Sequence, residues 1–156
     1  MQPATLETLN FAHAKTDWNA FLERVAQTFG CSTGTLHRFD ERDRHLKLVA
    51  SLKIPEVLMP VIQSIPIGKG IAGAAAERRE PVEMCNLQTD TSGVARPDAR
   101  KTQVQGSLAV PVMQGERLCG VLGIGKLTPY DFTDAEKEDL TEIGRRIAED
   151  LVSAGG

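Results

Sequence analysis

The sequence predicts an α+β sandwich built on an antiparallel sheet. Two pairs of segments alternate with a period of two residues, and a short polar turn joins the members of each pair, within 35–50 and 107–126. Strands joined by tight turns must pair antiparallel. Helical patterns with a period near 3.6 residues precede the first pair and follow the second. This order argues against a doubly wound parallel sheet.

The first helix is predicted from a continuous apolar face at helical spacing, made of Trp18, Phe21, Leu22, Val25, Ala26 and Phe29. Thr16 or Asp17 is suited to cap its start. Gly30 follows where helices commonly end in a left-handed residue. The alternating segments 35–39 and 46–50 then flank a charged turn, which predicts a hairpin.

The middle of the chain is punctuated by proline. Three prolines between residues 55 and 66 allow a short helix around 56–63 but no central strand, because proline cannot donate to a ladder. Ile71–Arg79 is alanine-rich and predicts a helix that Pro81 ends. A short strand is expected at Val82–Leu87.

The second hairpin carries the clearest strand signal. Leu108, Val110 and Val112 share one face of the first strand. In the second strand, strict alternation places Leu118, Leu122 and Ile124 on one face and Cys119, Val121, Gly123 and Gly125 on the other. Both faces are apolar or small, so we expect cover on both sides.

The C-terminal helix begins at a capping-box pattern, Thr133 followed three residues later by Glu136. Its expected buried stripe consists of Leu140, Ile143, Ile147, Ala148 and Leu151.

Length and composition limit the classes of function. The 156 residues suit a single domain, 1–156, with its core at about 18–151. A net charge of −3 without a basic cluster argues against nucleic-acid binding. The sequence shows neither a signal peptide nor a long apolar run, so we expect no membrane span and a cytoplasmic location. Three widely spaced cysteines form no disulfide framework.

Gly68–Gly73 spells G-x-G-x-x-G, the pattern of a dinucleotide-binding turn, and Asp90 follows at about the ribose-binding offset. The context does not match that function, since Pro66 interrupts the preceding segment and antiparallel hairpins follow. A phosphate-binding P-loop is excluded because no Gly-Lys-Ser/Thr ends the pattern. We interpret Gly68 and Gly70 as turn residues, and Gly73 as allowing close approach of helix and sheet.

Three blocks resemble the GAF domain family in order and spacing: Ile67–Gly73 followed by Glu80–Val82, Ser107–Val112 followed by Leu118–Leu122, and Phe132–Thr133 before the last helix. The resemblance implies a profilin-like antiparallel sheet of about five to six strands. It also implies N- and C-terminal helices on one face, and short helices and loops on the other. GAF domains are sensory modules that hold a small ligand between sheet and loops and commonly dimerise through their terminal helices.

The enzymatic relatives in this family are the free methionine-(R)-sulfoxide reductases, which need thiols. The resemblance places one of their cysteines inside the glycine block, where this chain has Ala72, and others in the following loop, 88–105, which contains none. Without a nearby thiolate there is no route to a sulfenic intermediate. Cys31, Cys85 and Cys119 are interpreted as small strand-associated residues, with a redox role of Cys85 left open.

We therefore predict a non-catalytic, small-molecule-binding regulatory module in signal transduction, acting as a homodimer through its terminal helices. A sulfoxide-reductase-like enzyme and a ligand-free dimerisation domain are the alternatives. Neither the ligand nor any cofactor is identified, and no metal site is expected. The candidate ligand-binding residues lie on strands and on the long polar loop: Phe39, Met84, Asn86, Asp90, Arg96, Arg100 and Ser107. The arginines would pair with a carboxylate or phosphate.

Overall fold

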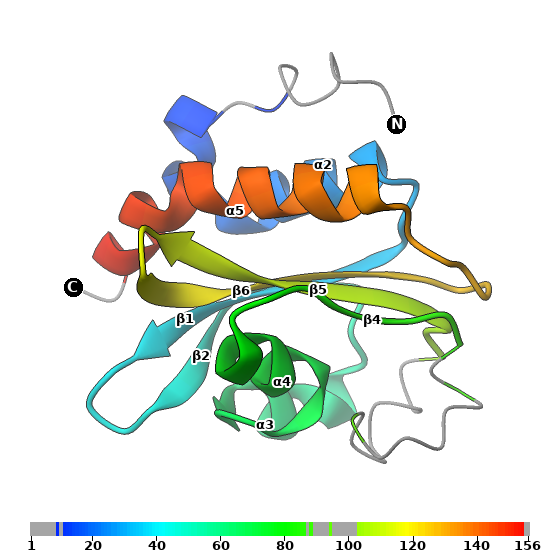
Figure 1. The fold of residues 1–156 in the computed structure, drawn as a ribbon, viewed down its shortest axis with the longest axis horizontal. Coiled ribbons are helices and arrows are strands. Elements are labelled where there is room, and N and C mark those ends of the chain that lie inside the picture. Colours follow the sequence, from blue (N-terminus) through cyan, green and yellow to red (C-terminus); the bar gives the residue numbers. More distant parts are fainter. Residues whose placement is uncertain (1–8, 10, 87, 89–93, 95–102, 155–156) are drawn as a thin grey trace.

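The fold is taken from a computed structural model, which describes residues 9, 11–86, 88, 94 and 103–154. Its centre is a six-stranded antiparallel sheet in the order β3-β2-β1-β6-β5-β4 (Figure 1). The strands are β1 (Thr33–Asp40), β2 (His45–Leu52), β3 (Ser64–Pro66), β4 (Val82–Met84), β5 (Gly106–Gln114) and β6 (Arg117–Lys126). The helices are η1 (Phe11–Thr16), α2 (Trp18–Thr28), η2 (Glu56–Leu58), α3 (Met59–Ile62), α4 (Gly70–Arg78) and α5 (Asp134–Ser153).

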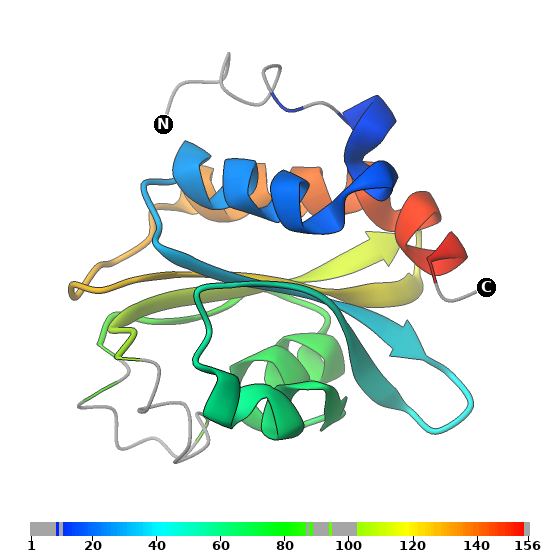
Figure 2. The same cartoon turned by 180° about the vertical axis from the view of Figure 1, so that it is seen from behind.

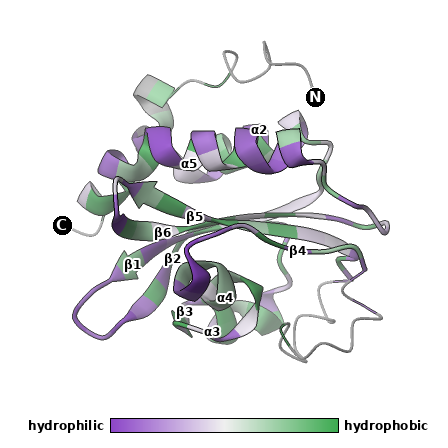
Figure 3. Cartoon of the chain, viewed as in Figure 1, coloured by the Kyte–Doolittle hydropathy of each residue, from purple (hydrophilic) through white to green (hydrophobic). Residues whose placement is uncertain are grey.

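The helices form a layer on each side of the sheet. Helices α2 and α5 lie side by side on one face, and α3 and α4 lie on the other, as both views show (Figures 1 and 2). Helix α5 alternates between hydrophilic and hydrophobic segments in Figure 3, as expected of a helix with one side on a sheet. The predicted α+β antiparallel arrangement is confirmed.

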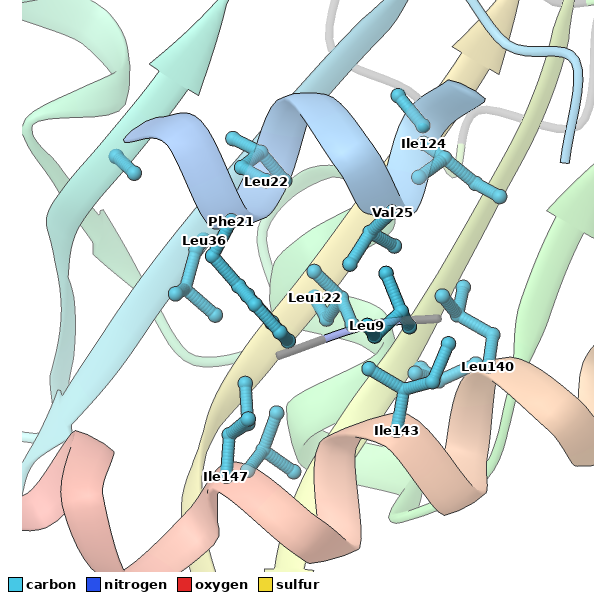
Figure 4. Close-up of a cluster of buried hydrophobic side chains, with 14 of the residues drawn as sticks. Leu9, Phe21, Leu22, Val25, Leu36, Leu122, Ile124, Leu140, Ile143 and Ile147 are labelled. Atoms are coloured by element: carbon cyan, nitrogen blue, oxygen red, sulfur yellow. The ribbon is translucent and has the colours of Figure 1, made fainter. Parts of the chain in front are cut away.

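The larger hydrophobic cluster fills the space between the sheet and the α2–α5 layer. Leu22, Leu36, Leu122 and Ile143 are fully buried there. Figure 4 shows their side chains converging from α2, β1, β6 and α5. A second cluster lies on the opposite face beneath α4, and includes Ala75 and Val121. The hairpin β5–β6 is therefore covered on both sides, as predicted.

One strand does not follow the strict alternation that the sequence predicts. Leu118 packs in the cluster beneath α4, and Cys119 packs in the cluster beneath α2 and α5, which reverses their expected faces. The cause is a bulge: the pairing shifts between Val112 and Met113, which face Gly120 and Leu118. An extra residue in one strand moves every side chain beyond it to the other face.

Local signals set the helix ends as predicted. The Asp17 carboxylate accepts a hydrogen bond from the Ala20 amide at 3.0 Å, and Gly30 follows α2 with a left-handed φ of 66°. At the start of α5, the Thr133 hydroxyl accepts from the Glu136 amide at 3.0 Å, and the Glu136 carboxylate accepts from the Thr133 amide at 2.8 Å. The capping box is therefore confirmed.

The proline-punctuated middle of the chain also follows its prediction. The helical segment expected around 56–63 is η2 followed by α3. Pro66 ends β3 at the sheet edge, where a missing amide donor is tolerated. Strand β4 ends at Met84, earlier than expected, since the next carbonyl, of Cys85, accepts a hydrogen bond from the Tyr130 amide at 2.9 Å. In the part of the chain that the structure describes, no helix is long and apolar enough to cross a membrane.

Candidate functional site: a cavity between the sheet and α4

The glycine-rich segment forms a tight turn that starts α4. Gly68 and Gly70 have left-handed φ angles of 87° and 68°, which side chains rarely adopt. A Cβ atom at Gly73 would lie 2.8 Å from the carbonyl oxygen of Pro66 in edge strand β3. The interpretation of these glycines as turn and close-approach residues is confirmed.

Behind this turn lies a cavity of about 170 Å³ between the sheet and the helices α3 and α4. Its floor comes from β1, β5 and β6, one wall from residues 54–65, and another from the first turn of α4. The lining residues are Thr33, Gly34, Thr35, Ile54, Leu58, Val61, Ile62, Ile65, Lys69, Gly70, Ile71, Ala72, Val104, Ser107, Leu108, Ala109, Gly123, Ile124 and Gly125. Most of this surface is apolar, as in small-molecule sites generally.

Glycine in β6 makes room for two threonines on the cavity floor. Gly125 pairs with Thr33 on one side and Ser107 on the other, and Gly123 pairs with Thr35. A Cβ atom at Gly125 would lie 2.6 Å from the Thr33 Oγ1 atom. The Thr33 hydroxyl therefore occupies the space above Gly125, which only a residue without a side chain leaves open.

The cavity presents hydrogen-bonding groups that have no protein partner. Among the described residues, none accepts from or donates to the hydroxyls of Thr33, Thr35 and Ser107. The Thr33 side chain belongs to a residue only 6% exposed. None of these hydroxyl oxygens is fully buried, since the one fully buried side-chain nitrogen or oxygen without a partner among the described residues is His37 Nδ1. These hydroxyls are consequently available to a bound molecule.

The first turn of α4, whose residues line the same cavity, has backbone donors without acceptors. Its first intrahelical hydrogen bond runs from the Gly73 amide to the Lys69 carbonyl at 3.0 Å. The amides of Gly70, Ile71 and Ala72 precede that bond and have no acceptor within the described chain, and no side chain caps the helix. A helix start of this kind carries a partial positive charge.

His37 contacts the backbone of one residue in the cavity wall, Ile62. It is 1% exposed, and its Nε2 atom lies 2.8 Å from the carbonyl oxygen of Ile62, which lines the cavity. Since a carbonyl only accepts, Nε2 carries the proton and donates. Burial lowers the pKa of His37 to about 4, so the ring is neutral at neutral pH. Its Nδ1 atom has no partner in the described structure.

Of the seven predicted ligand residues, one lines the cavity, three lie elsewhere and three fall outside the described residues. Ser107 lines the cavity. Phe39 is half-buried in the cluster beneath α4, with the Arg44 guanidinium 5.7 Å from its ring. Met84 is buried, and the Asn86 side-chain oxygen accepts from the Gln88 amide at 3.1 Å. Phe39, Met84 and Asn86 are therefore not among the described lining residues. The remaining three, Asp90, Arg96 and Arg100, lie outside the described residues.

The cysteines lie away from the cavity lining. Burial raises the pKa of Cys31 to about 11 and raises that of Cys119. The Asp131 carboxylate beside Cys85, which accepts a hydrogen bond from its thiol, raises the pKa of that thiol. Within the described residues, no three histidine, cysteine, aspartate or glutamate side chains group closely enough to hold a metal ion.

The family follows from a comparison with family models. The model described as the GAF domain matches residues 19–149. The chain belongs to the GAF domain family. Among curated proteins, no sequence matches the chain.

Solved structures share the fold of this GAF domain at low sequence identity. The GAF domain of an Acinetobacter phosphoenolpyruvate-protein phosphotransferase has a TM-score of 0.78 at 20% identity, and the match covers 99% of this chain and 97% of that one. Its counterpart from Coxiella burnetii has a TM-score of 0.79 at 18% identity, covering 97% and 92%. Free methionine-R-sulfoxide reductase from Neisseria meningitidis, in complex with its substrate, has a TM-score of 0.72 at 20% identity, covering 97% and 86%.

Sequence reasoning missed most of the cavity floor. The signal was present, because Thr33-Gly34-Thr35 and Gly123-Ile124-Gly125 each place small or hydroxyl-bearing residues at alternate positions of a strand. Such residues on one face of two adjacent strands leave a hollow. The pairing of β1 with β6, which brings them together, is not evident from either segment alone.

Proposed function

We propose that this GAF domain is a non-catalytic sensory or regulatory module that binds a small molecule in the cavity between the sheet and α4. The observation that supports the proposal is a mostly apolar cavity whose floor carries the Thr33 hydroxyl, which has no hydrogen-bond partner among the described residues and belongs to a residue only 6% exposed. An apolar pocket with a few convergent polar groups is the usual form of a ligand site. Binding would then alter how the domain acts on a signalling partner.

The alternative, a sulfoxide-reductase-like enzyme, has less support from the chemistry of the thiols. The fold neighbours include such reductases, but at 20% identity they share only the fold. In this chain Ala72 lines the cavity and no cysteine is among the lining residues described. All three thiols have raised pKa values, which lowers the fraction of thiolate, the reactive form.

Native mass spectrometry of the freshly purified protein, with an absorption spectrum of the same sample, tests the binding proposal. We expect a bound small molecule that is lost in Ala72→Leu, because the added carbons would project from α4 into the cavity. Arg78→Leu is the matched control at the exposed end of the same helix and should retain the ligand. If Ala72→Leu retains the same bound mass, the ligand occupies another site.

A separate assay tests the non-catalytic part of the proposal. We expect no thiol-dependent reduction of free methionine sulfoxide. Turnover that disappears in Cys85→Ser would establish the enzyme instead.

The homodimer through the terminal helices remains a prediction. It rests on the family resemblance and on the position of α2 and α5 together on one face of the sheet. Light scattering at micromolar protein concentration tests it, and a monomer mass would contradict it. A dimer that binds no small molecule would favour the dimerisation-only alternative.

A further inference from the structure

We infer that the cavity selects a small organic anion: a carboxylate attached to a compact apolar body. This inference rests on the proposed function, because it assigns a ligand class to the same cavity. It is carried by the size of the cavity and by two independent sets of hydrogen-bond donors on residues that line it.

The volume limits the size of the ligand. An apolar cavity of about 150 Å³ binds one benzene molecule. At about 170 Å³, this cavity accommodates a single ring or a short branched chain with one polar group. A nucleotide or a haem would not fit wholly within it. The mostly aliphatic walls, which include Leu58, Val61 and Ile71, match an apolar body.

The first set of donors is the start of α4. Gly70, Ile71 and Ala72 line the cavity and their amides have no acceptor among the described residues, and the exposed Lys69 is also a lining residue. Helix α4 spans nine residues, enough for its peptide dipoles to add a partial positive charge at this end. Amides at a helix start bind anions. None of the described lining residues is acidic; the Glu77 carboxylate lies beside Gly68, in the turn before α4.

The second set of donors lies on the sheet. The Thr33 hydroxyl belongs to a residue that is 6% exposed and has no hydrogen-bond partner among the described residues. It lies beside Gly125, where a Cβ atom would come within 2.6 Å of it. The Ser107 hydroxyl stands on the other side of the same glycine in the cross-strand row. Both can donate to a ligand oxygen. A cavity of this volume holds one small ligand, so both sets of donors act on the same molecule.

Benzoate, benzamide and benzamidine test this inference, because they have nearly the same shape but carry a negative charge, no charge and a positive charge. Isothermal titration calorimetry near neutral pH measures all three on the full chain. We expect benzoate to bind about tenfold more tightly than benzamide, since charge-assisted hydrogen bonds are roughly twice as strong as neutral ones. Benzamidine should bind more weakly than both.

Two variants assign the preference to the two donor sets. Lys69→Met should reduce the ratio of benzoate to benzamide affinity by about threefold and leave benzamide binding unchanged. Thr33→Val, which keeps the side-chain shape, should weaken benzoate by about threefold or more without lowering the thermal midpoint. Arg78→Met, at the other end of α4, is the charge control and should change neither affinity.

The outcomes separate this inference from the proposed function. If benzamide binds as tightly as benzoate, or benzamidine binds most tightly, the anion preference is wrong, while small-molecule binding stands. The same holds if Arg78→Met changes the ratio as much as Lys69→Met, because the effect is then a general one of net charge. If none of the three probes binds at millimolar concentration, the inference is overturned, while the native mass spectrometry experiment decides separately on the proposed binding function.

Discussion

Acidification from about pH 7 to about pH 5 should destabilise this protein through one buried side chain, His37. The ring is 1% exposed, and its Nε2–H group donates to the Ile62 carbonyl oxygen at 2.8 Å. Protonation would place a positive charge in an apolar environment, and no acidic side chain of the described residues is in hydrogen-bond contact with the ring. This desolvation is the main reason why its pKa falls to about 4.

The sign and size of the effect follow from proton linkage. The unfolded chain has the ordinary histidine pKa of 6.5 and therefore binds the proton before the folded chain does. The stability that neutral His37 provides is complete above the unfolded pKa and is lost as the pH falls toward the folded pKa. One pKa unit corresponds to about 1.4 kcal/mol, so at about pH 5 the loss is about 2 kcal/mol.

Urea unfolding at the two pH values measures the free energy of unfolding in each case. Other groups also titrate in acid, so the comparison uses His37→Gln, whose side-chain amide can still donate toward Ile62 but does not ionise. We expect the wild-type protein to lose about 2 kcal/mol more than this variant over the same pH interval. Equal losses in the two proteins would refute the assignment to His37.

Three further predictions concern the fold. Thr133→Ala should lower the free energy of unfolding by about 1 kcal/mol, because it removes the helix cap, and Thr133→Ser should restore it; equal stability of Ala and Ser variants in urea would contradict this. Ile143→Ala should lower the free energy of unfolding by about 3 kcal/mol and Ile143→Val by about 1 kcal/mol, since the residue is fully buried. If Ile143→Ala costs less than Ile143→Val, the residue does not lie in the core. Gly120→Ala should cost about 2 kcal/mol or more, because a Cβ atom would collide with the His37 carbonyl oxygen. Unchanged stability of Gly120→Ala in urea would contradict the reasoning.

The sequence predicts the elements of this fold well because most of them are specified locally. Asp17 and Gly30 bound α2, and the Thr133–Glu136 capping box fixes the start of α5, each within one helical turn. The faces of β6 near its start were predicted less well. The bulge opposite Val112 depends on how β5 and β6 pair, and the residue types at Leu118 and Cys119 do not predict it.

The site was less predictable because its residues are brought together by pairing between distant segments. Thr33 and Gly125 are separated by most of the chain and meet only through the β1–β6 ladder. Of the residues chosen from sequence, Ser107 reaches the cavity because its strand pairs on the other side of that ladder. Phe39 is on the same sheet, but it packs near Arg44 at the β1–β2 turn, away from the glycines that leave the cavity open.

The glycine-rich segment shows why a pattern needs its surroundings to be interpreted. In a dinucleotide-binding turn, the same spacing of glycines serves a parallel strand that leads directly into a helix. Here the preceding strand, β3, is a three-residue edge strand that pairs antiparallel with β2 and ends at Pro66. The turn nevertheless leaves the amides of Gly70, Ile71 and Ala72 without acceptors at the start of α4, and these three residues line a cavity that a nucleotide would not fit wholly within. What persists is the ability of a helix start to attract an anion, and the cavity volume restricts that anion to a small one.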